Sequence, residues 1–275
     1  MKDLRGKTAA ITGAGSGLGR AMALAFASEG MKVASADVDQ NGLDETASLL
    51  GAASLFTMRV DVSKESEVQA FCDRVDKPFL VCNNAGVSPL GAAWENSVGD
   101  WEWILGVNLW GVIHGVRAFA PRLIERNEGH IVNTASVAGL ISPPGSGAYN
   151  VTKHAVVALS ESLYHDLRER NCAVGVSVLC PAYVPTGISS SERNRPAGLS
   201  AGELSEMTKA KQANLKKAVA SGRLTADDVA AAVVKAVKED RFYILTHPRI
   251  KGAIEARMRD ILDERAPRDP LRLGG

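Results

Sequence analysis

The chain has 275 residues, a formal net charge of +1 and a hydrophobic content of 45%. This length suits one large α/β domain with a sizeable core, and the balanced charge leaves no basic stripe that would predict nucleic-acid binding. No apolar stretch approaches the roughly 20 residues of a membrane span, and the first residues, MKDLRGKTAAITGAG, lack the apolar region of a signal peptide. We therefore expect a cytoplasmic protein that binds neither nucleic acid nor a membrane.

Seven short runs of β-branched or apolar residues alternate with segments of helical spacing. This alternation is typical of right-handed βαβ units and therefore of a parallel sheet. The predicted strands are Thr8–Thr12, Lys32–Asp37, Ser54–Val60, Phe79–Cys82, His130–Ala135, Ala173–Cys180 and Phe242–Leu245. Neither an internal repeat nor a linker divides the chain, so we expect residues 1–275 to form one domain.

The segment from 183 to 224 interrupts the alternation. It has no strand-like run and contains the lysine-rich stretch KAKQANLKK at 209–217. Long insertions in compact folds are often lids, so we predict a substrate lid at 183–224, with its lysines on a solvated helix face. After it, Thr225 is expected to cap a new helix. Residues 247–275 are expected to form an amphipathic helix and a tail that pack on the body of the protein or on a second subunit.

The cysteines are Cys72, Cys82, Cys172 and Cys180, and no two of them form a C-x-x-C pair. Neither a redox motif nor a metal site is therefore predicted, although two of the thiols could be bridged in principle. We expect buried thiols in a reducing compartment.

A glycine-rich turn, ITGAGSGLGRAMALAF, begins at Ile11 and joins the first predicted strand to a helix. Glycine allows a sharp turn and the close approach of a ligand, and the N–H groups at the start of a helix favour an anion such as a pyrophosphate. The pattern is T-G-x-x-x-G-x-G rather than G-x-G-x-x-G, and a tight turn without a ligand would share it. The residues expected at such a ligand are Gly13, Gly15, Ser16, Gly17, Leu18 and Gly19.

An acidic residue, Asp37, ends the next predicted strand, twenty residues after Gly17. A carboxylate there can accept hydrogen bonds from the adenosine ribose of a dinucleotide and would repel a 2′-phosphate. No Arg or Lys lies at 38–42, and Arg20 is the nearest cation. These residues favour NAD over NADP, although Asp37 could also be a plain surface carboxylate.

A serine, a tyrosine and a lysine follow in TASVAGLISPPGSGAYNVTKHA, residues 134 to 155. Tyr149 and Lys153 would lie on one face of a helix. A free phenol has a pKa of ~10, and a nearby ammonium can lower it so that the phenol exchanges protons with an alcohol or a ketone. Ser136 could donate a hydrogen bond to the same substrate oxygen. Taken singly, the pair could be a surface-helix pair and Ser136 a loop hydroxyl.

Together these motifs resemble those of the short-chain dehydrogenase/reductase family. They occur in the family order: TGAGSGLG at 12–19, DV at 61–62, NNAG at 83–86, VN at 107–108, Ser136, YNVTK at 149–153 and PAYVPT at 181–186. The resemblance implies a Rossmann-like, doubly wound parallel sheet of about seven strands with helices on both faces. Two departures are Pro181-Ala182, where the family usually has Pro-Gly, and a short segment before Pro78, which predicts a small crossover helix.

The resemblance also implies roles for individual residues. Asn108 would distort its helix and support a proton relay, Asn83 would steady the central strands, and Lys153 would bind the nicotinamide ribose. The remaining residues expected at the cofactor are Asp61, Val62, Asn84, Ala85, Gly86, Pro181, Val184 and Thr186. Ser136, Tyr149, Lys153 and Asn108 would form the catalytic group.

The substrate pocket is expected after Ser136, within 182–224, and in part at the C-terminal helix. Its predicted lining is apolar: Leu140, Ile141, Pro143, Pro144, Tyr183 and Ile188. We predict an NAD-dependent dehydrogenase or reductase that interconverts a secondary alcohol and a ketone, with a bulky hydrophobic or aromatic substrate. Long helices near 103–126 and 148–170 could form the interface of a homodimer or homotetramer. The alternatives are an NADP-dependent 3-oxoacyl-type reductase and a non-catalytic nucleotide-binding protein.

Overall fold

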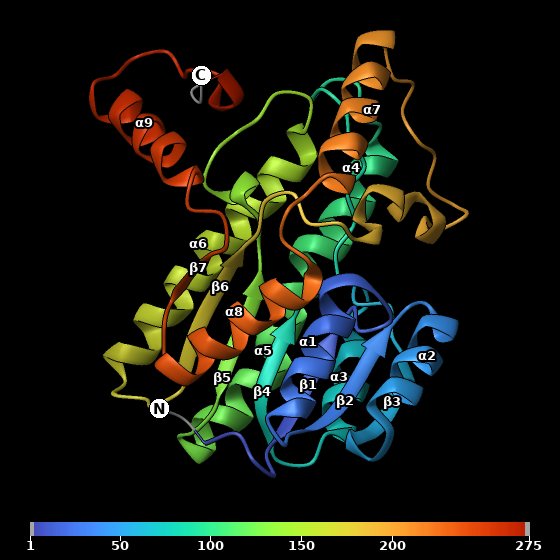
Figure 1. Ribbon diagram of the computed structural model, residues 1–275, viewed down its shortest axis with the longest axis vertical. Helices are drawn as coiled ribbons and strands as arrows, with labels where there is room; N and C mark the ends of the chain where they lie inside the picture. The colour runs from blue at the N-terminus through green and yellow to red at the C-terminus, as the bar shows by residue number, and fades with distance from the viewer. Residues whose placement is uncertain (1–2, 273–275) are drawn as a thin grey trace.

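A seven-stranded parallel sheet organises the computed structural model, which describes residues 3–272 (Figure 1). The strand order is β3-β2-β1-β4-β5-β6-β7. The bounds are β1 Thr8–Thr12, β2 Lys32–Asp37, β3 Ser54–Arg59, β4 Pro78–Asn83, β5 His130–Thr134, β6 Gly175–Cys180 and β7 Tyr243–Leu245. The predicted doubly wound fold is therefore confirmed. The ends of the predicted domain and of its tail, residues 1–2 and 273–275, lie outside the described residues.

Helices cover both faces of the sheet because successive strand residues point to opposite sides. Ala9 and Ile11 of β1 belong to one core layer, and Ala10 between them belongs to the other. The first layer is covered by α1 Gly17–Ser28, α2 Gln40–Leu50 and α8 Ala226–Glu239. The second is covered by α3 Glu65–Arg74, α5 Gly111–Arg126 and α6 Gly147–Glu169.

The strand order reverses between β1 and β4, because β2 and β3 lie on one side of β1 and β4 to β7 lie on the other. In open α/β sheets, ligands bind in the crevice that such a reversal opens at the carboxyl ends of the strands. The glycine turn after β1 and the NNAG segment after β4 meet there, since a Cβ on Gly13 would lie 2.8 Å from the Ala85 Cα.

The predicted lid segment, 183–224, contains the 3₁₀ segment η4 Gly187–Asn194 and the helix α7 Glu206–Ala220. Both lie beyond the carboxyl ends of the strands, beside the short helix α4 Val98–Leu105 (Figure 1). Lys209, Lys216 and Lys217 of α7 are exposed, as the sequence predicts. The predicted cap of α8 is confirmed, because Thr225 and Asp228 form a reciprocal capping box.

The C-terminal helix α9, Ile250–Leu262, stands away from the helices that cover the sheet (Figure 1). The short 3₁₀ turn η5 Pro270–Arg272 follows it, and Arg268 binds Asp260 from the intervening tail. The expected packing of this helix on the body is thus not seen over the sheet, and packing on a second subunit stays a prediction.

Two smaller expectations concern membranes and thiols. Within residues 3–272, no helix combines the length and the apolar character that crossing a bilayer requires. All four cysteines are buried and free, so no bridge forms between them.

Candidate active site

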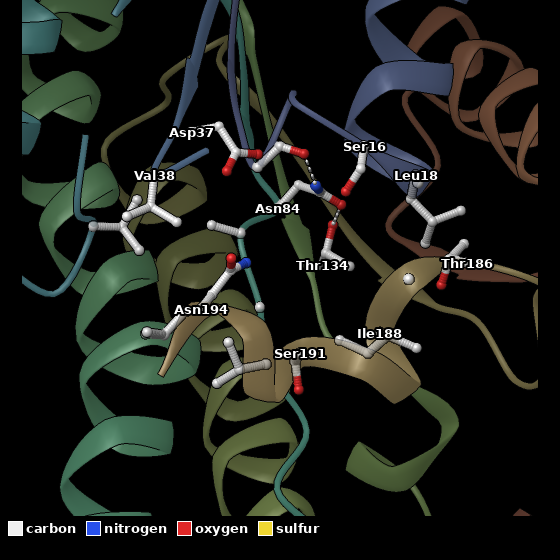
Figure 2. A pocket seen from close by; sticks show the side chains of 18 of the residues that line it. Ser16, Leu18, Asp37, Val38, Asn84, Thr134, Thr186, Ile188, Ser191 and Asn194 are labelled. Atoms are coloured by element: carbon white, nitrogen blue, oxygen red, sulfur yellow. Dashed lines mark hydrogen bonds between the residues drawn. The ribbon is translucent and has the colours of Figure 1, made fainter. Parts of the chain in front are cut away.

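A cavity of about 520 Å³ opens at the carboxyl ends of the strands, at the reversal of strand order (Figure 2). Its size is within the range of small-molecule and cofactor sites. The predicted site residues that line it are Gly13, Ser16, Gly17, Leu18, Asp37, Asp61, Val62, Asn84, Ala85, Gly86, Ser136, Tyr149, Lys153, Pro181, Val184, Thr186 and Ile188. Residues far apart in the sequence therefore converge on one space.

The glycine turn brings the start of α1 to the edge of this cavity. Gly13 and Gly17 have positive φ angles of 67° and 53°. A Cβ at Gly19 would lie 1.9 Å from the Gly13 carbonyl oxygen, so only glycine fits there. No acidic side chain occupies the first turn of α1 and Ser16 makes no side-chain cap, so the N–H groups at this helix end face the cavity without a competing carboxylate.

Asn84 fixes the turn to the neighbouring strands. Its side-chain amide donates to the Thr12 carbonyl at 3.1 Å. Its side-chain oxygen accepts from the Thr134 hydroxyl at 3.2 Å (Figure 2). Asn83 points elsewhere and donates to Asn133 on β5 at 2.9 Å in the buried core. Asn84 thus joins the ends of β1, β4 and β5 beside the cavity.

Asp37 lies at the other end of the cavity from Thr186 (Figure 2). Its carboxylate accepts from the Gly15 N–H at 2.8 Å and from the Asp39 N–H at 3.0 Å. Arg20 donates to the carbonyl oxygens of Gly15 and Gly42, so it is held against α2 and does not line the cavity. The carboxylate is therefore not neutralised by Arg20.

Arg59 is a cation at this end that sequence reasoning missed. It is the register partner of Asp37 across β2 and β3, lines the same cavity, and donates to the Val38 carbonyl at 3.2 Å. The sequence prediction considered Arg20 and positions 38–42, whereas parallel pairing brings the end of β3 beside the end of β2. A predicted register would have revealed it.

Tyr149 and Lys153 lie one turn apart on α6 and both line the cavity. The Lys153 Nζ is 5.6 Å from the centre of the Tyr149 ring and donates to the Thr134 carbonyl at 2.9 Å. Ser136 faces the phenol from the end of β5, and its hydroxyl also donates to the Pro181 carbonyl at 3.3 Å. The structure thus brings the three predicted groups together.

Burial controls the protonation of this pair. It raises the pKa of Tyr149, while the hydrogen bond with Ser136 lowers it. Burial also lowers the pKa of Lys153 to about 8. We expected Lys153 to lower the pKa of the phenol toward neutrality, but in this structure burial raises that pKa. Burial favours the neutral form of each group.

Asn108 lies behind the cavity and does not line it. It is fully buried in a π-helical turn, η2 Gly106–Trp110, between α4 and α5. Its side chain accepts from the Val87 N–H at 2.8 Å and donates to the Val87 carbonyl at 2.9 Å. It also donates to Thr152 on α6 at 3.3 Å, so its contacts hold the loop after β4 against α6.

Several predicted site residues do not line the cavity. Gly15 and Gly19 lie within the turn, where Gly15 binds Asp37 through its backbone. Leu140 packs instead against the buried cluster that contains Val156 and Val157. Tyr183 is 38% exposed and does not line the cavity, although its neighbours Ala182 and Val184 do.

Other residues expected in the pocket lining do not line this cavity. Ile141 is buried in the core, and neither Pro143 nor Pro144 lines the cavity. The described residues of α9 do not line it either. The apolar wall comes instead from Val87, Trp103, Val184, Ile188 and Val219. Trp103 was missed because the loop after β4 and α4 were not considered as parts of the pocket.

The segment 183–224 crosses the cavity opposite the glycine turn, with Ile188, Ser191 and Asn194 of η4 directed at it (Figure 2). It is fastened to the loop after β4, where the Ser88 N–H donates to Ser191 at 3.0 Å. It is also fastened to α4, where Arg195 and Asp100 form a buried ion pair of 2.6 Å. The segment therefore forms one wall of the cavity.

These features define a class of protein, a dinucleotide-dependent oxidoreductase of the Rossmann type. A family model described as short chain dehydrogenase matches residues 7–197, and the chain belongs to the short-chain dehydrogenase/reductase family. A family member from Burkholderia phymatum, solved in complex with NAD, is 51% identical with a TM-score of 0.96 over 99% of this chain and 100% of that one.

Other relatives cover nearly the whole chain. The CLA biosynthesis dehydrogenase/reductase of Lactiplantibacillus plantarum is 34% identical over 97% of each chain. The apo form of LigO from Sphingobium sp. is 34% identical, with a TM-score of 0.78 over 96% of this chain and 90% of that one.

Proposed function

We propose that this oxidoreductase uses NAD to interconvert a secondary alcohol and a ketone. The observation that supports it most is the convergence of three elements on one cavity: the glycine turn, Asp37 and the Ser136, Tyr149 and Lys153 group. If the glycine turn were only a structural loop, and Tyr149 and Lys153 only a surface pair, they would not be expected to line the same cavity. Residues 183–224 act in this proposal as the lid over the substrate.

The residues fit a dinucleotide. The space beside Gly13 and Gly19 is too tight for any Cβ, and the free N-terminus of α1 suits a pyrophosphate. Asp37 suits the adenosine ribose hydroxyls, with Asp61 and Val62 beside the adenine and Thr186 and Val184 near the nicotinamide carboxamide. NAD, when bound, supplies C4 of its nicotinamide as the hydride acceptor or donor.

Tyr149 takes the alcohol proton during oxidation and returns it to the ketone oxygen during reduction. Ser136 donates a hydrogen bond to the same oxygen and so orients the substrate. The protonated ammonium of Lys153 stabilises the phenolate of Tyr149, and Lys153 also holds the nicotinamide ribose. Asn108 fixes the surrounding backbone. Because burial favours the neutral phenol, we expect the oxidation rate to rise with pH.

The substrate is proposed to be hydrophobic or aromatic and fairly bulky. Val87, Trp103 and Ile188 line the cavity together with the backbone of the loop after β4. Such walls favour apolar groups, and the polar groups at Tyr149 fix the reacting oxygen. The test is a panel of alcohols and ketones, with NADH absorbance followed in both directions. Turnover of bulky secondary alcohols supports the proposal, and tight NADH binding without turnover of any compound favours a binding-only protein.

The preference for NAD is proposed from Asp37, supported by the NAD-bound relative. A ribose 2′-phosphate would meet its carboxylate, and Arg20 is held against α2. Asp37→Ala is expected to weaken NADH binding and to reduce the ratio of NADH to NADPH affinity by about tenfold or more. Dissociation constants for both cofactors measure this ratio. An unchanged ratio would show that Asp37 does not bind the ribose hydroxyls.

The assembly is proposed to be a homodimer or homotetramer formed through α5 and its neighbour α6. Trp110, just before α5, and Val151 on α6 are each about half exposed, at 51% and 50%. Large apolar side chains on two long neighbouring helices suit a subunit interface. Sedimentation of the wild type and of Val151→Asp tests it, and a monomeric wild type would contradict it.

A further inference from the structure

A bound pyrophosphate would bring two negative charges to a turn that offers only N–H groups. The first turn of α1 has one cation, Arg20, and that side chain is held by Gly15, Gly42 and Thr46. Helix N–H groups alone can bind a phosphate, but guanidinium groups bind phosphates more strongly because they make parallel, charge-assisted hydrogen bonds. A cation at this end of the cavity would therefore strengthen the binding of a pyrophosphate at the start of α1.

The described residues that line the cavity include four cations, Arg59, Lys153, Arg193 and Arg195. Arg59 lies at the Asp37 end, and Lys153 lies beside Tyr149. Arg195 is paired with two carboxylates, Asp100 and Glu192. By elimination, Arg193 is the lining cation that stays available to a ligand.

Arg193 uses one nitrogen for its own segment. Its Nη1 donates to the carbonyl oxygens of Gly187 and Ser190, both at 2.9 Å. Among the ion pairs of residues 3–272, none involves Arg193, and these two bonds leave Nε and Nη2 for another acceptor. The side chain is solvent-exposed at the cavity mouth, so a ligand can reach it.

The contacts of η4 place this guanidinium near the start of α1. Thr186 lies against the glycine turn, because a Cβ on Gly17 would be 3.2 Å from the Thr186 Cβ. The next residue is Gly187, and a Cβ on it would be 3.2 Å from the Arg193 Nη2. Figure 2 shows Thr186 beside Leu18 and near Ser16, at the end of the cavity away from Asp37. The Arg193 guanidinium therefore lies against Gly187, and the residue before it, Thr186, touches Gly17 at the start of α1.

We infer that Arg193 binds the pyrophosphate of the dinucleotide from the side opposite the glycine turn. The inference rests on the cofactor placement proposed above and is independent of the substrate. The α1 N-terminus and the Arg193 guanidinium then hold the two phosphates between them. Arg193 thereby links the segment that walls the substrate pocket to the bound cofactor.

The test compares dissociation constants for NADH, ADP and adenosine in three variants, measured by calorimetry. Arg193→Met is expected to weaken NADH and ADP binding about five- to tenfold and to leave adenosine binding unchanged. Arg193→Lys should recover part of the loss, because it keeps the charge without the planar fork. Lys216→Met removes an exposed charge from α7 outside the cavity and should bind all three ligands as the wild type does.

Salt dependence gives a second readout. Because an ionic contact is lost, NADH binding to Arg193→Met should weaken less with added salt than binding to the wild type. Equal NADH constants in wild type and Arg193→Met would overturn the inference while leaving the cofactor proposal intact. Equal losses for adenosine and ADP would overturn it too, because the effect would then come from the fold. Failure of the wild type to bind NADH would instead contradict the cofactor placement itself.

Discussion

Lys153 is a basic residue that the fold buries almost completely. It is 3% exposed, and its Nζ donates a hydrogen bond to the Thr134 carbonyl. A Cβ on Gly86 would lie 3.7 Å from this Nζ, so the backbone after β4 closes over it. Burying an ammonium costs free energy, and functional sites are where proteins tolerate such a cost.

Lys153→Met is expected to raise the free energy of unfolding near pH 7 by up to about 3 kcal/mol. The pKa of Lys153 is about 8 in the folded protein against an ordinary value of 10.5. Below pH 8 the folded protein keeps a buried charge that the unfolded chain solvates, and this cost fades as pH rises from about 8 to 10.5. Denaturant unfolding near pH 7 and near pH 9.5 measures the gain, which should shrink at the higher pH.

The matched control for this change is Lys209→Met, because Lys209 is exposed on α7. Its removal should change stability little at either pH, since surface charges contribute little. A gain for Lys153→Met of the same size at both pH values would mean that burial of its charge is not the cause.

The element that most constrains the site is the turn between β1 and α1. This turn packs closely against the NNAG segment at 83–86, and its N–H groups face the cavity. Gly19 is the tightest point, because any side chain there would run into the Gly13 carbonyl. By contrast, a Cβ on Gly252 within α9 would meet nothing within 4 Å, so no close packing requires glycine there.

Gly19→Ala is expected to destabilise the protein by about 2 kcal/mol or more, because a backbone atom must move, and to weaken NADH binding. Gly252→Ala is the matched control and should be neutral or stabilising by up to about 1 kcal/mol, since alanine favours a helix interior. Thermal unfolding with and without NADH measures both. Normal NADH binding by a stable Gly19→Ala protein would show that the turn does not shape the site.

At the scale of the whole molecule, two distant segments meet over the cavity. Asp100 at the start of α4 accepts from the Gly202 N–H at 2.9 Å and binds Arg195 at 2.6 Å. Arg195 also lies 4.4 Å from the centre of the Trp103 ring. A buried ion pair with these added contacts fixes the position of 183–224 more than surface pairs could.

Arg195→Met should loosen the segment 183–224, because the Asp100 carboxylate would stay buried without its cation. We expect the free energy of local opening to fall by about 2–4 kcal/mol. Hydrogen exchange of the amides in 183–224 measures it, with Lys209→Met as the control. Unchanged exchange in this segment would show that the ion pair does not hold it.

The sequence predicted what depends on local patterns. The seven strands, the glycine turn, Asp37 at the end of β2 and the Thr225 cap all follow from residue types at fixed spacing. What depends on three-dimensional packing was missed. Tyr183 and Leu140 do not line the cavity, and Arg59 reaches it through strand pairing. The pKa of Tyr149 could not be predicted either, because the degree of burial that raises it is set by the tertiary fold.

The most direct test of the central claim is the turnover of Tyr149→Phe with a substrate found in the alcohol and ketone panel. The phenol is proposed to exchange the proton, so turnover should fall by roughly 10²–10⁴-fold while NADH binding stays near that of the wild type. Tyr243→Phe, which removes a phenol that binds Glu161 away from the cavity, should turn over normally. Near-normal turnover by Tyr149→Phe would contradict the account.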